Sequence, residues 1–529
     1  MNLLKQKVSL FVLVSLLIIG GQAVMGAKFP ANFTWGASTA AYQIEGAWNV
    51  SGRGLDWNSW KALHDKTPLN ETAFIAVDFY DRFQEDIDLM KKVGLKNFRM
   101  SISWTRVLPN GTLDYVNQEG VDFYNKVFDA LHAAGIEPWV TIFHNDYPQA
   151  LNYPNATGAW LNPKAADIFN DYAEFCFKTF GDKVKNWITL NEPEISAWYG
   201  YGNAGSLPLR CSPSYSARCA EMGGGGNSST EPYIATKNLI LSHARAVQTY
   251  RNKYKASQGG QIGWTLNINY ALPWNASEPN DVAAVETYLQ FAIGWYLGPT
   301  IYGDYPQIMK DYVTGGRLPA FTESEKQLIK GASDFVGINH YTSFYVHHTG
   351  EVGTDYGSDP RLVTNTSDIN GNPIGIVGES DWLFAYPYGL RGITKWISQN
   401  YGNPPIAVFE NGFDVKGESS LPKLEALADT KRVSYINNYI DNMVAAVVED
   451  NVNMIGYFVW SWMDNWEWGS YIPRFGLIYV DYANNLTRTP KASAYFYIEK
   501  TKKITEWANG EGEYPHFRAG KFNNQIIKY

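Results

Sequence analysis

Cysteine and basic runs are both scarce in this chain. Three of its 529 residues are cysteine, and no cluster of Cys and His has the spacing of zinc ligands. The 44 Lys and Arg against 52 Asp and Glu give a formal net charge of −8, with no basic block. Because nucleic-acid binding needs a basic surface, the sequence excludes nucleic acid as a partner and predicts no metal site.

Long apolar runs are confined to the beginning of the chain. Lys5 and Lys7 precede a short apolar run, and small residues follow it. The run is too short to span a bilayer comfortably, so we expect residues 1–26 to be a secretory signal peptide. Residues 27–529 then form the mature chain, as one domain without a membrane anchor. An uncleaved anchor is the alternative.

Two further features fit secretion. Nine Asn-x-Ser/Thr sites are acceptors for N-glycosylation. Cys211 and Cys219 lie close together in a Gly-, Ser- and Pro-rich stretch, where an oxidising compartment favours a disulfide between them; two free thiols are the alternative. We expect an extracellular protein, with a vacuole or another endomembrane compartment as the other destination.

Aromatic residues are abundant. The chain has 19 Trp, 35 Tyr and 26 Phe, which is 15% of its residues. A large hydrophobic core explains this content. A carbohydrate-binding cleft explains it too, because flat rings match the C–H faces of pyranose sugars. Composition leaves both explanations open.

Eight short apolar segments with the character of buried strands alternate with amphipathic helical patterns. The strand segments are 33–37, 97–101, 137–144, 184–192, 261–267, 334–339, 406–410 and 453–460. The helical segments include 80–93, 118–134, 165–180, 232–254 and 431–449. This alternation predicts an α/β fold, a single (β/α)8 TIM barrel. The loops after the fourth, sixth and eighth strands are long, and loops in that position build the active site of such barrels.

Polar or aromatic side chains stand at or near the ends of these strands. They are Gln43, Arg99, His144, Asn191, Glu192, Asn267, Asn269, Asn339, Tyr341, Glu410 and Trp460. Taken alone, Arg99 fits a buried ion-pair partner, His144 a core histidine and Tyr341 a packing residue. As a set they are hard to attribute to packing, because each buried polar group would need its own partner.

Two of these side chains are glutamates in segments far apart in the chain. Glu192 lies in Thr-Leu-Asn-Glu-Pro and Glu410 in Phe-Glu-Asn-Gly. One protonated and one ionised carboxyl that face each other can cleave a glycosidic bond. Arg99 and Tyr341 nearby would favour the ionised form of Glu410, and a negative Glu410 would keep Glu192 protonated. A separation of about 5 Å gives retention and a wider one inversion; the sequence leaves that distance open.

Longer motifs surround these residues. Residues 33–46 are FTWGASTAAYQIEG, residues 98–104 are FRMSISW, residues 460–468 are WSWMDNWEW and residues 474–477 are RFGL. In these motifs the chain resembles glycoside hydrolase family 1, the β-glucosidase family, from about Phe29 to Lys503. The resemblance implies a retaining β-glycosidase without cofactor. Such an enzyme removes terminal non-reducing β-D-glycosyl residues from small glycosides or short oligosaccharides by double displacement.

The resemblance also implies a role for each site residue. Glu192 resembles the acid/base and Glu410 the nucleophile, whereas Arg99 and Tyr341 resemble the groups that hold and tune Glu410. The residues that resemble sugar-binding groups are Gln43, His144, Asn191, Trp460, Glu467, Trp468 and Phe475. Among them, Asn191 is similar to the donor to the sugar 2-hydroxyl. Trp460 is similar to the platform under the sugar ring.

The chain departs from the family pattern at four places. The family usually has Trp, Thr and His where this chain has Asn145, Phe409 and Phe79. The segment 468–471 also looks shortened. A tryptophan N–H donor near the sugar is therefore missing, or an amide replaces it. These departures concern sugar preference more than catalysis.

Other activities fit the residues less well. Thioglucosidases of the family replace the acid/base by glutamine, whereas this chain has Glu192. Phospho-glycosidases need a basic pocket, and Glu467 would repel a phosphate there. A transglycosidase shares the same glutamates, and a non-catalytic sugar-binding protein typically lacks one of them. The natural aglycone, the preferred sugar and the oligomeric state stay open.

Overall fold

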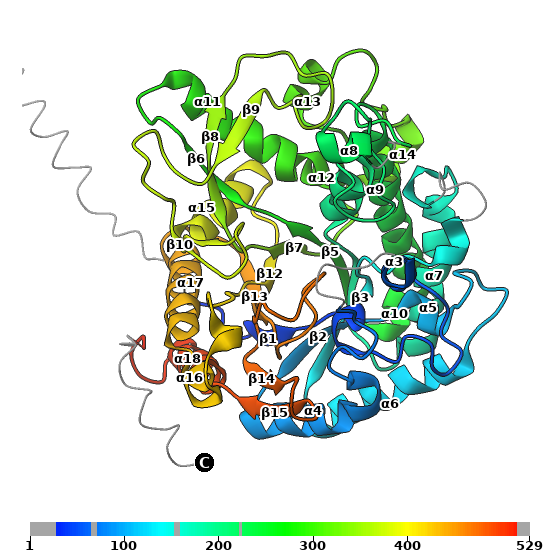
Figure 1. Cartoon of the computed structure of the whole chain (residues 1–529), viewed down its shortest axis with the longest axis vertical. Helices are drawn as coiled ribbons and strands as arrows, with labels where there is room; N and C mark the ends of the chain where they lie inside the picture. The colour runs from blue at the N-terminus through cyan, green and yellow to red at the C-terminus, as the bar shows by residue number, and fades with distance from the viewer. Residues whose placement is uncertain (1–27, 65–70, 153–158, 222–224, 516–529) are drawn as a thin grey trace, which may run out of the picture.

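The computed structural model describes residues 28–64, 71–152, 159–221 and 225–515. Within these residues, eight parallel strands close into a barrel (Figure 1), in the order β1-β13-β12-β7-β5-β4-β3-β2. The strands are β1 (Thr34–Ser38), β2 (Asn97–Ser101), β3 (Glu137–Phe143), β4 (Asn186–Asn191), β5 (Gln261–Asn267), β7 (Val336–Asn339), β12 (Ile406–Glu410) and β13 (Met454–Trp460). The predicted TIM barrel is confirmed. The predicted signal peptide, residues 1–26, lies outside the described residues.

Each predicted strand corresponds to one barrel strand. The bounds of β2, β5 and β12 are those predicted, and the other strands differ by one or two residues at one or both ends. The strand predicted for 137–144 ends at Phe143, so His144 stands in the loop beyond it. The close agreement arises because parallel barrel strands are covered on both faces and therefore form short continuous apolar runs.

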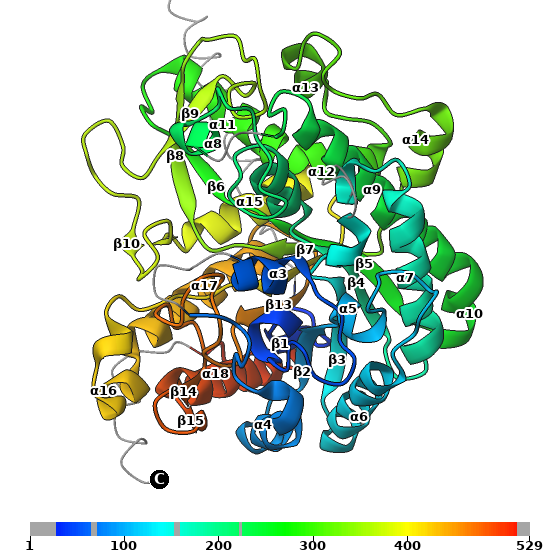
Figure 2. The same cartoon turned by 45° about the vertical axis from the view of Figure 1, so that its right-hand side comes forward.

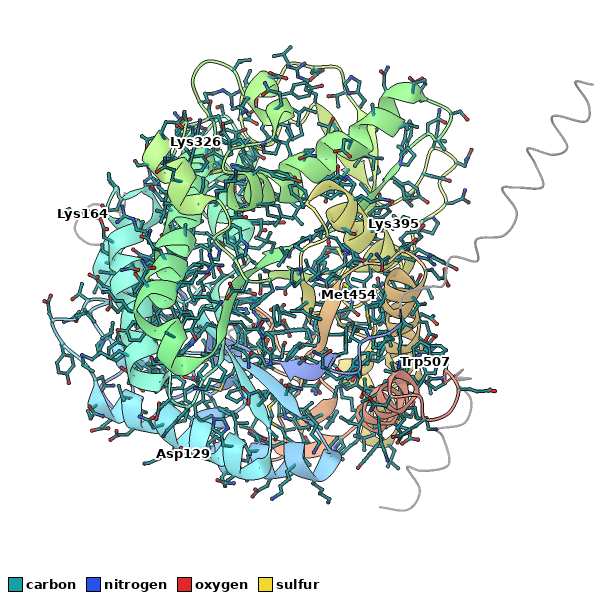
Figure 3. The ribbon with its side chains drawn as sticks, turned by 180° about the vertical axis from the view of Figure 1, so that it is seen from behind. Asp129, Lys164, Lys326, Lys395, Met454 and Trp507 are labelled. Atoms are coloured by element: carbon teal, nitrogen blue, oxygen red, sulfur yellow. A yellow bond between two sulfur atoms is a disulfide. The ribbon has the colours of Figure 1, made fainter. Side chains whose placement is uncertain are left out.

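Helices form the outer ring of the barrel. The main ones are α4 (Phe79–Val93), α6 (Gln118–Ala134), α7 (Ala165–Phe180), α9 (Glu231–Thr249), α15 (Tyr388–Asn400), α17 (Thr430–Val448) and α18 (Ala492–Ala508). The helix predicted for 232–254 is α9 followed by one π-helical turn, η4 (Tyr250–Tyr254). From behind, Lys395 of α15 and Trp507 of α18 lie on the outer ring, with Met454 of β13 nearer the centre (Figure 3).

Shorter elements complete the described chain. The helical ones are α2 (Ala41–Ile44), α3 (Trp57–His64), α5 (Trp104–Val107), η1 (Gln149–Asn152), η2 (Ala159–Leu161), η3 (Ile195–Tyr199), α8 (Ala217–Glu221), α10 (Lys255–Gln258), α11 (Pro279–Leu289), η5 (Gln290–Gly294), α12 (Trp295–Leu297), η6 (Gly298–Tyr302), α13 (Gln307–Tyr312), α14 (Glu323–Ile329), η7 (Glu418–Ser420) and α16 (Lys423–Ala428). The small strands are β6 (Tyr270–Pro273), β8 (Ser343–His348), β9 (Leu362–Asn365), β10 (Ile376–Val377), β11 (Phe384–Ala385), β14 (Ile478–Asp481) and β15 (Thr487–Pro490).

The small strands lie in the loops that follow barrel strands. Strands β6, β8 and β9 form one small sheet, which lies with α11 at the top of Figures 1 and 2, away from α4 and α6 at the bottom. Strands β14 and β15 pair in the long loop after β13. Because these insertions follow β5, β7 and β13, they lengthen the wall at the carboxyl ends of the strands. No helix of the described chain is both long enough and apolar enough to cross a bilayer.

An aromatic layer fills the inside of the barrel. The ring centroids of Trp139 and Phe409 are 5.4 Å apart, and that of Phe458 lies 5.4 Å from Trp139 and 5.3 Å from Phe409. The Arg99 guanidinium carbon lies 5.6 Å from the Phe409 ring centroid. Phe409, one of the departures from the family pattern, is therefore a core residue. It supports the site from below and is not part of the pocket wall.

Candidate active site

A pocket of about 510 Å³ opens among the loops that follow the barrel strands. Most of the predicted site residues line it, namely Gln43, His144, Glu192, Tyr341, Glu410, Trp460, Glu467, Trp468 and Phe475. Arg99 and Asn191 are fully buried and contact residues of this lining. Folding thus gathers into one site the strand-end residues that the sequence analysis singled out.

Glu410 is the last residue of β12 and pairs with two buried side chains. Nη1 of Arg99, on β2, donates to Glu410 Oε1 at 2.5 Å, and the Tyr341 hydroxyl donates to Oε2 at 2.8 Å. Burial raises the pKa of the Glu410 carboxyl, while Arg99 and Tyr341 both act to lower it because they stabilise the anion. The positively charged guanidinium of Arg99 is therefore the counter-ion of the Glu410 carboxylate.

Glu192 follows β4 directly and has a different environment. Its backbone is left-handed, with a φ of 46°, an uncommon conformation for a residue other than glycine that is typical of functional sites. The side-chain amides of Asn339 and Asn267 donate to Oε1 at 2.9 and 3.0 Å. Burial, and then the neighbouring Glu410, raise the pKa of Glu192 to about 7, and the two amides oppose this rise.

A short chain of hydrogen bonds connects the two carboxyls. Arg99 Nη2 donates to Asn191 Oδ1 at 2.6 Å, and the Asn339 amide nitrogen donates to the same oxygen at 3.1 Å and to Glu192. The Asn339 amide is also close enough to Glu410 to act to lower its pKa. Glu192 and Glu410 are thus joined by continuous hydrogen bonds through Asn339, Asn191 and Arg99.

The two carboxyls therefore act as an electrostatically coupled pair. Two negative charges so close together and out of water are unfavourable, so the pair retains a proton up to about pH 7. Glu410 has the guanidinium of Arg99, whereas Glu192 has only neutral amides. The proton consequently resides on Glu192. Two neighbouring carboxyls, one protonated and one ionised, are the pair that a retaining glycosidase uses.

One corner of the pocket presents fixed polar groups. Trp460 Nε1 donates to Glu467 Oε1 at 3.1 Å, and Gln43 Nε2 donates to the other Glu467 oxygen at 3.3 Å and to the Trp466 carbonyl at 2.8 Å. Burial raises the pKa of Glu467 well above its usual range. The Gln43 Oε1 atom is buried and accepts no hydrogen bond from the described residues. It is an acceptor that a bound hydroxyl group could satisfy.

Aromatic rings form the adjoining wall. The His144 ring is nearly parallel to Trp460 and Trp468, with centroid separations of 6.1 and 6.2 Å. Burial and the nearby Arg99 lower the pKa of His144 well below its usual range, so the ring is neutral at pH 7. Its Nε2 lies 3.2 Å from the Asn191 amide nitrogen. Phe475 packs edge-on against Tyr341 at 5.9 Å.

The departures from the family pattern fall in different places. Asn145 lines the pocket next to His144. Phe79 is fully buried, 6.4 Å from the Phe98 ring, and is not part of the pocket lining. Trp468 begins the shortened segment and is 45% exposed at the pocket wall. Of these positions, Asn145 and Trp468 can bear on what the pocket binds.

Sequence reasoning missed much of the lining that comes from loops and short helices. These residues include Trp57, Asn58, Ser196, Tyr199, Leu207, Ser380 and Trp382. Their only common signal is membership of a long loop or of a short helix that follows a strand. A local pattern does not distinguish the loop residues that face a pocket from those that face solvent.

The predicted disulfide is confirmed. Cys211 and Cys219 are bonded, with a Cα–Cα distance of 5.9 Å. Both cysteines are buried beside Ala204, in the loop that also brings Leu207 to the pocket wall. The cross-link therefore braces a segment of that wall.

A TIM barrel with a coupled carboxyl pair at the bottom of a sugar-sized polar and aromatic pocket defines a glycosidase. Residues 25–505 match the model of glycosyl hydrolase family 1. The chain belongs to this family, whose β-glucosidases are retaining glycosidases.

Known relatives cover almost the whole chain. It is 43% identical over 478 residues to beta-glucosidase 40 of Arabidopsis thaliana, with 89% of this chain and 92% of that protein covered. A rice Os3BGlu6 beta-glucosidase variant in a covalent complex with Glc superposes with a TM-score of 0.84 at 41% identity, covering 89% of this chain and 98% of that one. For a beta-glucosidase of the fungus Humicola insolens in complex with glucose, the TM-score is 0.85 at 41% identity, covering 91% and 99%.

Proposed function

We propose that this protein is a β-glucosidase with Glu410 as nucleophile and Glu192 as acid/base. The observation that carries the proposal is the unequal surroundings of the two carboxyls. Glu410 is paired with Arg99, and Glu192 is buried among amides beside that negative charge. The pair is therefore prepared with one nucleophile and one proton donor before substrate arrives.

In the first step, a Glu410 oxygen forms a bond to the anomeric carbon as the bond from that carbon to the leaving oxygen breaks. Glu192 gives its proton to the departing oxygen, so the aglycone leaves as a neutral alcohol. The resulting ester removes the negative charge of Glu410, which is one of the causes of the raised Glu192 pKa. Glu192 is then stable as a carboxylate.

In the second step, Glu192 accepts a proton from water, and the water oxygen forms a bond to the anomeric carbon. The ester bond breaks and Glu410 returns to its pairing with Arg99. Two inversions at one carbon give net retention, so the sugar leaves as the β anomer. No metal or organic cofactor takes part in either step.

The remaining pocket residues supply sugar recognition in this proposal. Gln43 and Glu467 lie on one corner and would bind hydroxyl groups, and Trp460 would support the flat face of the ring. Asn191 is held by Arg99 and Asn339 beside the carboxyls, where it would meet the hydroxyl next to the anomeric carbon. The relatives named beta-glucosidases support glucose as the sugar.

A kinetic panel of p-nitrophenyl β-glycosides tests the activity. We expect the highest kcat/KM on the glucoside, compared with the galactoside, fucoside and mannoside. Cello-oligosaccharides added to the panel measure the preferred substrate length. A higher kcat/KM on another sugar would change the substrate assignment. Absence of turnover on every substrate would favour a non-catalytic sugar-binding protein.

We also propose that the protein is secreted after removal of residues 1–26. The disulfide between Cys211 and Cys219 supports this, because such bonds persist in oxidising compartments. Sequencing the amino terminus of protein collected from the culture medium tests it. A start at residue 27 is expected, and retention of the protein in the membrane fraction would argue for an anchor.

A further inference from the structure

We propose that Asn145 is a specificity-determining residue, whose side-chain amide donates a hydrogen bond to a hydroxyl group of the terminal sugar. The hydroxyl is one on the side of the ring that faces His144. This inference rests on the proposed function and adds a recognition contact to it. It concerns a position where the chain has asparagine instead of the tryptophan usual in the family.

Asn145 lies in the wall of the pocket that holds the two carboxyls. It follows His144 directly at the end of β3, and both residues line the same pocket as Glu192 and Glu410. The His144 ring stands parallel to Trp460 and Trp468, which adjoin the corner formed by Gln43 and Glu467. Asn145 therefore lies in the wall of the pocket that holds the two carboxyls, next to this row of rings.

The side chain of Asn145 is held in one orientation. The Ser196 hydroxyl donates to Asn145 Oδ1 at 2.7 Å. A carboxamide is planar, with its nitrogen on the side away from its oxygen, so this contact directs Nδ2 elsewhere. Within the described residues, Nδ2 donates to no protein acceptor, although Asn145 is half-buried. A donor pair that is left without a protein partner in a pocket wall is available to a ligand.

The backbone of Asn145 is also held. Its φ of 59° is left-handed, a conformation that asparagine adopts more readily than most residues. Asn58 Nδ2, from α3, donates to the Asn145 carbonyl at 2.7 Å. Two contacts from two other elements thus fix both the main chain and the side chain. Little conformational freedom remains to be lost when a hydroxyl group binds, which favours a strong contact.

A set of deoxy substrates tests the contact. The wild-type protein and Asn145→Ala are compared on p-nitrophenyl β-glucoside and on its 2-, 3-, 4- and 6-deoxy forms. On the complete sugar, we expect Asn145→Ala to lower kcat/KM about 10- to 100-fold. On the one deoxy sugar that lacks the partner hydroxyl, the wild-type protein is already slow and the substitution causes no further loss. That pattern identifies the hydroxyl.

Two further variants sharpen the comparison. Ser196→Ala removes the contact that orients the amide, so it should give a smaller loss with the same dependence on the deoxy position. Asn442→Ala is a matched control on the outer helix α17 and should leave all kcat/KM values unchanged. Thermal unfolding of each variant shows whether the fold is retained.

Clear outcomes overturn the inference. An equal loss for Asn145→Ala on all the sugars would mean a purely structural role. A loss that changes with the aryl leaving group, at constant sugar, would place Asn145 against the aglycone. Absence of wild-type turnover on the complete glucoside would instead count against the proposed function. The two failures are therefore distinguishable.

Discussion

Arg99 Nη1 lies 2.5 Å from Oε1 of Glu410, although the two residues are 311 positions apart in the chain. Glu410 is the last residue of β12 and Arg99 is the middle residue of β2, and both side chains are buried. No comparable cation contacts Glu192 among the described residues, and its hydrogen bonds come from amides. This one ion pair therefore decides which carboxyl is the anion and which keeps the proton.

Replacing the proposed nucleophile should remove turnover. For Glu410→Ala, we expect kcat on p-nitrophenyl β-glucoside to fall by about 10⁴-fold or more, because no other side chain is placed to form the covalent intermediate. The thermal unfolding midpoint and the circular dichroism spectrum serve as controls for the fold. Activity within tenfold of wild type, in a folded variant, would exclude Glu410 from this role.

Replacing the proposed acid/base should have an effect that depends on the leaving group. Glu192→Ala removes the proton donor, so phenyl β-glucoside should lose about 10²- to 10⁴-fold in kcat/KM. A 2,4-dinitrophenyl glucoside leaves without a proton and should lose much less. The measurement is the slope of log kcat/KM against the pKa of the leaving phenol, in wild type and variant. Equal slopes would contradict the acid role.

The pH dependence of kcat/KM should follow the two carboxyls. The Glu192 pKa of about 7 predicts that activity declines above about pH 7, because the free enzyme then loses the proton it must donate. On the acid side, activity declines as Glu410 gains a proton. Rates from pH 4 to 9 on p-nitrophenyl β-glucoside measure both limits. A rate that is flat from pH 6 to 9 would argue against Glu192 as the acid.

Tyr341→Phe should move the acid limit of that profile. The Tyr341 hydroxyl donates to Glu410 and stabilises its anion, so its removal raises the Glu410 pKa. Activity should therefore begin to fall at a higher pH on the acid side. Tyr302→Phe is a matched control, because Tyr302 is 57% exposed and donates to the Asn400 carbonyl. An unchanged acid limit in Tyr341→Phe would mean that this contact only positions the carboxyl.

The stereochemistry of the product tests the spacing of the carboxyls. A separation near 5 Å predicts covalent catalysis and release of the β anomer first. Proton NMR of the reaction, recorded before mutarotation, measures the ratio of anomers. An initial excess of the α anomer would require inversion and a water between the carboxyls.

Removal of the disulfide should lower stability more than chemistry. Cys211→Ser with Cys219→Ser removes a short cross-link, which is worth about 2–3 kcal/mol of unfolding free energy in the chain-entropy model. Urea unfolding without reductant measures this change. Reductant should destabilise the wild-type protein and leave the double variant unaffected. Equal midpoints for both proteins, with and without reductant, would contradict the contribution of the bond.

Local sequence was sufficient for the barrel and for much of the site. Buried strands such as β2 and β12 are continuous apolar runs, and such runs are visible without knowledge of the fold. The same strand prediction also indicates which side chains gather at the site, because the carboxyl ends of barrel strands converge. Family motifs then added residues that lie beyond strands, including Glu467 and Phe475.

Tertiary structure determined every feature of the site that depends on contacts between distant segments of the chain. The proton-sharing of Glu192 with Glu410, the amide of Asn339 between them, and the orientation of Asn145 by Ser196 all join different strands or loops. These contacts depend on how the strands align when the barrel closes, and no local pattern encodes that alignment. The residue types were therefore readable from the chain itself. Their protonation, partners and directions exist only once the distant strand ends have been brought into one buried, low-dielectric pocket.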